Sequence, residues 1–212
     1  MKTFEEIYQF IRPGESMLYS LVTKDRCKKI WEMFENVKDL KGDFIEIGCW
    51  RGGTASLIAS QMKNFELKNS LFLCDTWSGI PNKISKIDAF YKEGFHHDAT
   101  ISQVTRLFFD LGLNDLNIEI LEGIFPEETA KLIPESTKFK LVNLDVDIYT
   151  SAKECFTYLW PKIVSDGIVI IDDYLWPNTP GISKFIDEIK HEYLGKFIEI
   201  PCAKYQYILK KI

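Results

Sequence analysis

Short apolar runs alternate with amphipathic stretches along the 212-residue chain. Five runs, at residues 44–47, 71–74, 118–121, 141–144 and 168–171, predict buried strands separated by helical stretches. Two further runs at 197–200 and 205–209 predict a hairpin at one edge. Because repeated strand–helix units place parallel strands in one sheet, we expect an α/β fold. Its sheet would have seven strands, mainly parallel, with a C-terminal antiparallel hairpin and helices on both faces.

The clearest helical periodicity lies at residues 23–40, where one face carries Ile30, Met33, Phe34, Val37 and Leu40. Further helices are expected from about residue 54 and over 100–111, 151–159 and 182–193. A short helix is expected with Pro126 in its first turn. Long connections remain at 76–97 and 172–180, and connections of such length are usually functional or mobile.

Composition and charge exclude several classes of protein. Hydrophobic residues make up 46% and charged residues 27%, which is the balance of a globular chain. A net charge of −5 argues against a nucleic-acid partner. The longest aliphatic run, 168–171, is far shorter than the roughly 20 residues that span a bilayer, so no membrane partner is expected. The acidic N-terminal residues do not resemble a signal peptide, which predicts a cytoplasmic protein.

Cysteine and histidine usage limits the metal chemistry. The five cysteines are odd in number and show no C-x-x-C spacing, so neither a disulfide framework nor a zinc site is indicated. Three histidines leave few nitrogen ligands, so any metal would be held by oxygen.

The glycine-rich turn after the first predicted strand is the first candidate site, because ligands bind beyond the carboxyl ends of strands in open α/β sheets. Its glycines permit a sharp turn and a close approach to a ligand, although the spacing is not G-x-G-x-x-G. The alternative is an ordinary βα turn. The residues of the turn that we consider are Glu46, Gly48, Cys49, Arg51, Gly52, Gly53 and Thr54.

Two further strand ends contribute to the same crevice. Asp75 follows the second strand, where a carboxylate accepts both hydroxyls of a ribose. The alternative for Asp75 is a helix cap or a surface position. Gly123 follows the third strand and would allow close approach, while Ile124 or Phe125 could cover a base; the alternative is an ordinary turn with a core aromatic.

Four carboxylates cluster after the fourth and fifth strands: Asp145, Asp147, Asp172 and Asp173. Unpaired, they would repel one another, and a divalent cation with hard oxygen ligands relieves this repulsion. In the alternative interpretation they are helix caps and loop acids, with Asp147 capping the following helix and one of the Asp172–Asp173 pair solvated.

The residue pattern of the long 76–97 connection does not indicate its function. His96 and His97 would supply a base or a ligand, or would simply be exposed loop residues. Trp77, Phe95, Tyr174 and Trp176 would wall an acceptor pocket or pack the loops down.

Four motifs together resemble the macrocin O-methyltransferase family of metal-dependent, S-adenosylmethionine-using enzymes. They are GDFIEIGCWRGG at 42–53, CDTWSGIP at 74–81, LDVDIYTS at 144–151 and IIDDY at 170–174. The resemblance implies a Rossmann-like class I methyltransferase fold. It also implies that residues 1–41 form a helical segment covering the cofactor site and that 42–212 form the methyltransferase part of a single domain.

The resemblance further implies a role for each matching residue. Glu46, Gly48 and the turn up to Thr54 would hold the methionine part of S-adenosylmethionine. Asp75, with Thr76 beside it, would hold the ribose, and Gly123, Ile124 and Phe125 would lie by the adenine. Asp145, Asp172 and Asp173 resemble ligands of Mg²⁺ or another divalent cation, and Asp147 resembles the general base, with Asp145 also in the catalytic group.

The predicted function is therefore Mg²⁺-assisted methylation of a hydroxyl on a sugar, phenol or other small natural-product acceptor, with a vicinal diol among the options. Two alternatives stay open: a nicotinamide-dependent oxidoreductase, and a non-catalytic protein that binds a nucleoside. The edge hairpin and an N-terminal helix are compatible with a homodimer. The identity of the acceptor and the choice between Mg²⁺ and Mn²⁺ stay open.

Overall fold

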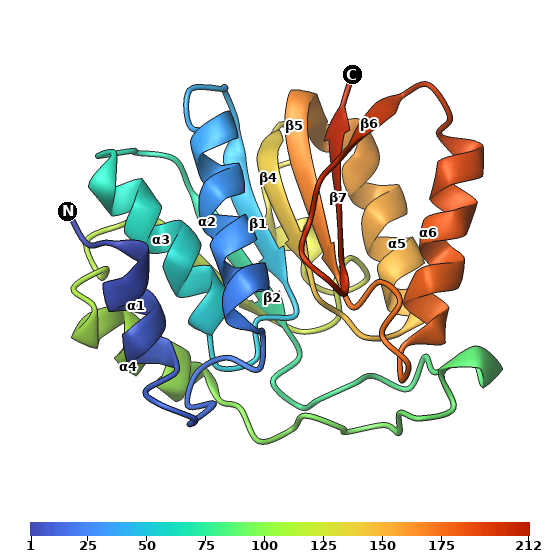
Figure 1. Ribbon diagram of the computed structural model, residues 1–212, viewed down its shortest axis with the longest axis horizontal. Coiled ribbons are helices and arrows are strands. Elements are labelled where there is room, and N and C mark those ends of the chain that lie inside the picture. Colours follow the sequence, from blue (N-terminus) through green and yellow to red (C-terminus); the bar gives the residue numbers. More distant parts are fainter.

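A single seven-stranded sheet forms the centre of the molecule in the computed structural model, which describes residues 1–212 (Figure 1). The strands are β1 (Asp43–Ile47), β2 (Leu71–Asp75), β3 (Ile118–Glu122), β4 (Phe139–Leu144), β5 (Ile163–Asp172), β6 (Phe197–Ile200) and β7 (Gln206–Lys211). The helices are α1 (Phe4–Ile11), α2 (Lys24–Val37), α3 (Gly53–Asn64), α4 (Ile101–Asp110), α5 (Tyr149–Leu159) and α6 (Pro180–Glu192). Three short 3₁₀ turns are η1 (Lys86–Asp88), η2 (Ala130–Leu132) and η3 (Trp160–Lys162).

The strand order is β3-β2-β1-β4-β5-β7-β6, with β1 to β5 parallel and β7 antiparallel to both of its neighbours. The chain reverses its direction of sheet growth between β1 and β4, and this switch point is where open α/β sheets bind ligands. The mainly parallel sheet and the C-terminal hairpin are confirmed. The hairpin inserts β7, not β6, beside β5.

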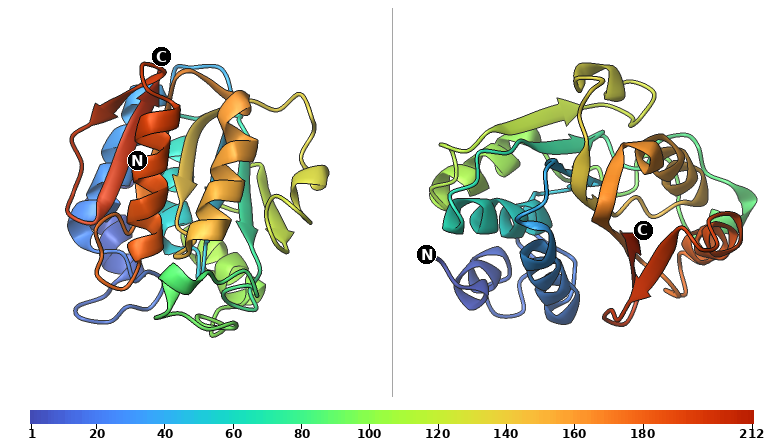
Figure 2. Two further views of the ribbon diagram at one scale, coloured as in Figure 1. Left: turned by 90° about the vertical axis from the view of Figure 1, so that its right-hand side faces the viewer. Right: turned by 90° about the horizontal axis from the view of Figure 1, so that it is seen from above.

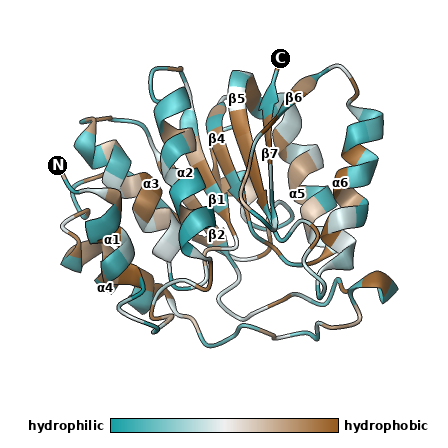
Figure 3. Cartoon of the chain, viewed as in Figure 1, coloured by the Kyte–Doolittle hydropathy of each residue, from teal (hydrophilic) through white to brown (hydrophobic).

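Alternation of side chains along the strands divides the core into two layers, one on each side of the sheet. Figure 2 shows the helices that cover the two faces. One layer packs α1, α2, α3 and α4 against residues such as Phe44 and Ile170. The other packs α5, α6 and the segment after β3 against residues such as Ile45 and Ile171. The strands at the centre are accordingly apolar and the outward helix faces polar (Figure 3).

The structure differs from the predicted elements in three places. Helix α1 precedes the first predicted helix; Thr3 and Glu6 form its capping box, and Phe4, Ile7 and Ile11 are its buried face. The segment after Pro126 forms turns and then η2, so the prediction of a short helix with Pro126 in its first turn is wrong. Strand β5 begins at Ile163, five residues earlier than expected, because it pairs with β4 across a register shift between Phe139 and Leu141.

No helix of the structure is both long enough and apolar enough to cross a membrane.

Candidate active site

A cavity of about 600 Å³ opens at the carboxyl edge of the sheet, around the switch point between β1 and β4. It is lined by the ends of β1 to β5, by the segment that precedes α2, and by part of the 76–97 connection. Twelve residues predicted for the site line this cavity: Gly48, Cys49, Thr54, Asp75, Thr76, Gly123, Ile124, Phe125, Asp145, Asp147, Asp172 and Asp173.

Gly48 brings the ends of β1 and β4 into close contact. Its φ is +83°, and a Cβ added there would lie 1.6 Å from the carbonyl oxygen of Asp145. Any larger residue would therefore push apart the two strand ends that carry the turn and the first carboxylate. Gly53 plays a similar part at the start of α3, where a Cβ would lie 2.3 Å from the carbonyl oxygen of Tyr19.

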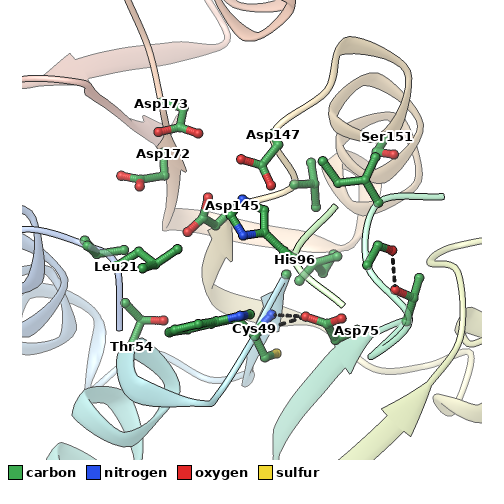
Figure 4. A pocket seen from close by; sticks show the side chains of 18 of the residues that line it. Leu21, Cys49, Thr54, Asp75, His96, Asp145, Asp147, Ser151, Asp172 and Asp173 are labelled. Atoms are coloured by element: carbon green, nitrogen blue, oxygen red, sulfur yellow. Dashed lines mark hydrogen bonds between the residues drawn. The ribbon is translucent and has the colours of Figure 1, made fainter. Parts of the chain in front are cut away.

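Asp75 joins the glycine turn to the end of β2. Its Oδ2 accepts hydrogen bonds from the backbone N–H groups of Cys49 (2.7 Å) and Trp50 (2.8 Å), and its Oδ1 accepts one from Trp77 (2.8 Å). Burial raises the pKa of Asp75, and the three amide donors act in the opposite direction. The carboxylate therefore organises the turn from the cavity wall (Figure 4) instead of lying on the surface.

Four other predicted residues, Glu46, Arg51, Gly52 and Gly53, support the turn from outside the cavity lining. Glu46 is completely buried, and its two oxygens accept hydrogen bonds from Thr54 Oγ1 (2.8 Å) and Asn143 Nδ2 (3.0 Å). Burial raises the pKa of Glu46 to about 7. Arg51 stacks on the ring of Trp50 and pairs with Asp98.

The four predicted aspartates meet on the opposite side of the cavity from Asp75 (Figure 4). Asp145, Asp147 and Asp173 each place one carboxylate oxygen within 4.8 Å of the other two. Burial raises the pKa of Asp145 and Asp147, and raises the pKa of Asp173 to about 7. These three therefore form a group of desolvated, mutually repelling oxygens.

Asp172 stands apart from this group because α2 supplies it with a cation. The guanidinium of Arg26 donates to Asp172 Oδ2 and lies 3.4 Å from Asp173 Oδ1. The other oxygen of Asp172, Oδ1, is buried and has no hydrogen-bond partner. The metal ligands predicted from the sequence are Asp145, Asp172 and Asp173. The three carboxylates that lie closest together in the structure include Asp147 in place of Asp172.

The alternative explanations for the acids do not fit this geometry. Asp147 does not cap α5, because the N-cap residue is Ile148 and the N–H of Tyr149 donates to Asp88 Oδ2. Neither member of the Asp172–Asp173 pair is solvated, since their side chains are 6% and 14% exposed.

The 76–97 connection contributes a buried tyrosine and a histidine to the site. Tyr91 donates its hydroxyl hydrogen to Asp147 Oδ1 (2.8 Å). His96 is half-buried in the cavity wall, and burial lowers its pKa, whereas His97 is exposed. Phe95 and Trp176 also line the cavity, but Trp77 and Tyr174 do not.

Arg26 and Tyr91, which contact the four aspartates, are the polar site residues that sequence reasoning missed. The sequence could have indicated Arg26. It stands four residues before Ile30 and eight before Phe34, so it is a charged residue on the buried face of α2. Nothing in the sequence could have indicated Tyr91, because the loop around it has no periodic pattern.

The strand order, the glycine turn after β1 and the acids at the ends of β2, β4 and β5 define a class I methyltransferase fold. The solved structure of the O-methyltransferase NovP has a TM-score of 0.81 and 23% identity, and covers 91% of this chain and 82% of that chain. The calicheamicin methyltransferase CalS11 has a TM-score of 0.74 at 15% identity over 98% of this chain and 90% of that one.

The chain belongs to the macrocin-O-methyltransferase family, whose model matches residues 12–197. A demethyldecarbamoylnovobiocin O-methyltransferase of Streptomyces niveus is 25% identical over 198 residues, which are 89% of this chain and 74% of the relative. A mycinamicin III 3''-O-methyltransferase of Micromonospora griseorubida is 27% identical over 146 residues, 64% of this chain and 56% of the relative. The predicted family is therefore confirmed, and the protein is an O-methyltransferase rather than an oxidoreductase or a non-catalytic binding protein.

Proposed function

We propose that this enzyme transfers the methyl group of S-adenosylmethionine to a hydroxyl of a sugar or other small natural-product acceptor, with help from Mg²⁺ or another divalent cation. The observation that carries the proposal is the juxtaposition, in one cavity, of the glycine turn with Asp75 and the buried aspartates of β4 and β5. The names of the relatives, which act on novobiocin-type, tetracenomycin and mycinamicin compounds, support the acceptor class.

The cofactor would lie along the β1, β2 and β3 ends. The turn at Gly48 and Cys49 would face its methionine part, and Ile124 and Phe125 would flank the adenine. Asp75 would accept a ribose hydroxyl, since a carboxylate has about four acceptor positions and three are taken by backbone amides. Glu46, Arg51, Gly52 and Gly53 would act indirectly, by holding the turn. Proteins of the same fold have been solved in complex with S-adenosylhomocysteine (SAH), among them an O-methyltransferase from Bacillus cereus, and this supports the choice of cofactor.

The acidic group fits a hard divalent cation. Three carboxylate oxygens lie within 4.8 Å of one another, and the buried Oδ1 of Asp172 has no partner. Oxygen ligands of this kind suit Mg²⁺, Mn²⁺ or Ca²⁺. Asp145 and Asp173 would hold the ion, with Asp172 Oδ1 completing the protein ligands and Asp147 beside it as the base. When bound, the ion lowers the pKa of an acceptor hydroxyl and offsets the charge of the cluster.

The chain's own residues would then direct the transfer. Asp147 accepts the proton of the acceptor hydroxyl. The hydroxyl oxygen forms a bond to the methyl carbon as the carbon–sulfur bond breaks, and S-adenosylhomocysteine leaves with the electron pair on sulfur. Met17, Leu21, Phe90, Phe95 and Trp176 form the apolar wall of the acceptor side and exclude water.

Calorimetry and a transfer assay test this proposal together. We expect micromolar binding of S-adenosylmethionine but not of NAD. We also expect methyl transfer to vicinal diols on sugars or phenols that stops in chelator and returns with Mg²⁺. Binding of NAD, or full transfer in chelator, would contradict the cofactor or the metal part respectively.

A further inference from the structure

The 76–97 segment, which we call the strap, crosses the carboxyl edge of the sheet along the lower side of Figure 1. Its two ends are tied to each other, because the N–H of Ile80 donates to the carbonyl of Phe95 (2.8 Å) and the N–H of Gly94 donates to that of Ile80 (2.9 Å). Lys83 also anchors it to Glu154 of α5 (2.7 Å). The strap is therefore a fixed part of the site.

Two side chains of the strap hold the turn between β4 and α5 from two points. Tyr91 donates its hydroxyl hydrogen to Asp147 Oδ1 (2.8 Å). Asp88, which is fully buried, accepts the backbone N–H of Tyr149 on Oδ2 (3.1 Å). Both ends of the three-residue stretch 147–149 are thus fixed by residues about 60 positions away in the chain.

Asp147 needs such an anchor. Its backbone has a φ of +61°, which disfavours most side chains, and one of its carboxylate oxygens lies within 4.8 Å of a carboxylate oxygen of both Asp145 and Asp173. The only neutral hydroxyl that contacts it is that of Tyr91, which donates to Oδ1.

Tyr91 is itself held in place before any ligand binds. Its side chain is 7% exposed, and its ring packs edge-on against Phe90 (5.2 Å between centroids) and Phe95 (5.5 Å). Ile80 and Ile148 complete its buried surroundings. The hydroxyl is therefore presented to Asp147 at little further cost in side-chain entropy.

We propose that Tyr91 is a positioning residue, which holds the carboxylate of Asp147 in the orientation that lets it accept the proton of the acceptor hydroxyl. Asp88 fixes the backbone of the same turn. This inference rests on the proposed function to the extent that Asp147 takes the proton.

Tyr91→Phe removes the hydroxyl and keeps the buried ring. We expect kcat to fall about tenfold, while KM for S-adenosylmethionine and Kd for S-adenosylhomocysteine stay within twofold. Tyr193→Phe is the matched control, because Tyr193 also sits in an aromatic cluster, against Phe156 and Trp160, but away from the cavity. Its kcat should not change. An unchanged kcat in Tyr91→Phe would overturn the proposal.

A double-mutant cycle separates positioning from a merely structural role. In an Asp147→Ala background Tyr91→Phe should cost nothing further, because its effect passes through the missing carboxylate. Losses that multiply would mean that Tyr91 acts in another way, and would reject the proposal.

Crystal structures of the native protein and Tyr91→Phe give a readout that needs no activity. We expect the Asp147 carboxylate to leave its position, or to occupy several, in the variant. A carboxylate that stays in place overturns the inference. If the native enzyme methylates no diol, the proposed function fails, but this comparison still decides whether Tyr91 positions Asp147.

Discussion

The two halves of the cavity differ in how many hydrogen-bond donors reach their buried carboxylates. In the β1–β2 half, Asp75 receives three backbone N–H groups, and Glu46 receives a hydroxyl and an amide. In the β4–β5 half, four aspartates share the donors of Arg26 and Tyr91, and Asp172 Oδ1 has none.

The buried carboxylates of the first half have enough hydrogen-bond donors, whereas those of the second half have too few. Buried polar groups are normally satisfied, and an unsatisfied one costs free energy of folding. The hydrogen bonds to Asp75 therefore contribute to the stability of the protein, whereas the crowded acids of the second half, which form the proposed cation site, reduce it. Removing Asp75, which accepts three backbone N–H groups, should accordingly lower stability, whereas removing Asp173 should raise it.

Asp173→Asn should produce the largest change in activity. Loss of a carboxylate at the proposed cation site should reduce methyl transfer by about 10³-fold. The same substitution removes one of the repelling charges, so we expect the melting temperature of the metal-free protein to rise by a few degrees. Transfer assays and calorimetric melting check both effects. A lower melting temperature would contradict the idea that the cluster is unsatisfied.

Asp75→Ala should have the opposite effect on stability. Three backbone amides lose their acceptor, which should lower the free energy of unfolding by roughly 3 kcal/mol, and binding of S-adenosylhomocysteine should weaken strongly. Denaturant titration and calorimetry measure the two. The exposed Asp110, paired with Arg106, is the control, and Asp110→Ala should change stability by less than about 1 kcal/mol.

Glu46→Gln should change how stability depends on pH. The folded state holds the Glu46 proton up to pH about 7, above its ordinary value of 4.5, so the native protein gains stability from this proton at low pH. That contribution is lost as pH rises through about 7. Because glutamine mimics the protonated form, the variant should be more stable than the native protein at pH 8 by roughly 2 kcal/mol, with no gain at pH 4. Equal stability at pH 8 would mean that Glu46 is not penalised by burial.

The smallest expected effect is on the melting temperature with added cation. Mn²⁺ or Mg²⁺ should raise it by a few degrees at pH 8 and by less at pH 6. The pKa values of Asp172 and Asp173 are raised to about 7, so protons compete with the cation below that pH. The shift should disappear in Asp173→Asn. A shift that is larger at pH 6 would argue against these carboxylates as ligands.

Much of the site could be predicted because parallel strands end at one edge of a sheet. The register pairs Ile47 with both Cys74 and Leu144, so the residues that follow each must meet. This rule brings Gly48, Asp75 and Asp145 together without any knowledge of side-chain packing. The seven strands and their hairpin follow from the same apolar runs.

The different surroundings of Asp172 and Asp173 could not be predicted in full. Period-two alternation places Asp172 on the same face as Ile168 and Ile170, which pack in the core layer that contains α2. That alternation separates the two neighbours, but it does not say that α2 presents Arg26 at this point. The Tyr91 contact depends on an irregular loop path, for which neither periodicity nor turn chemistry gives a rule.

The ion pair between Arg26 and Asp172 also orders events during synthesis. The two residues are 146 positions apart, so a ribosome adding about 5–20 residues per second needs roughly 7–30 s between them. Throughout that interval the guanidinium of Arg26 has no carboxylate of β5 to meet. The acidic cluster is therefore completed only late in translation, and a nascent chain shorter than 172 residues carries the glycine turn and Asp75 without Asp172 and Asp173.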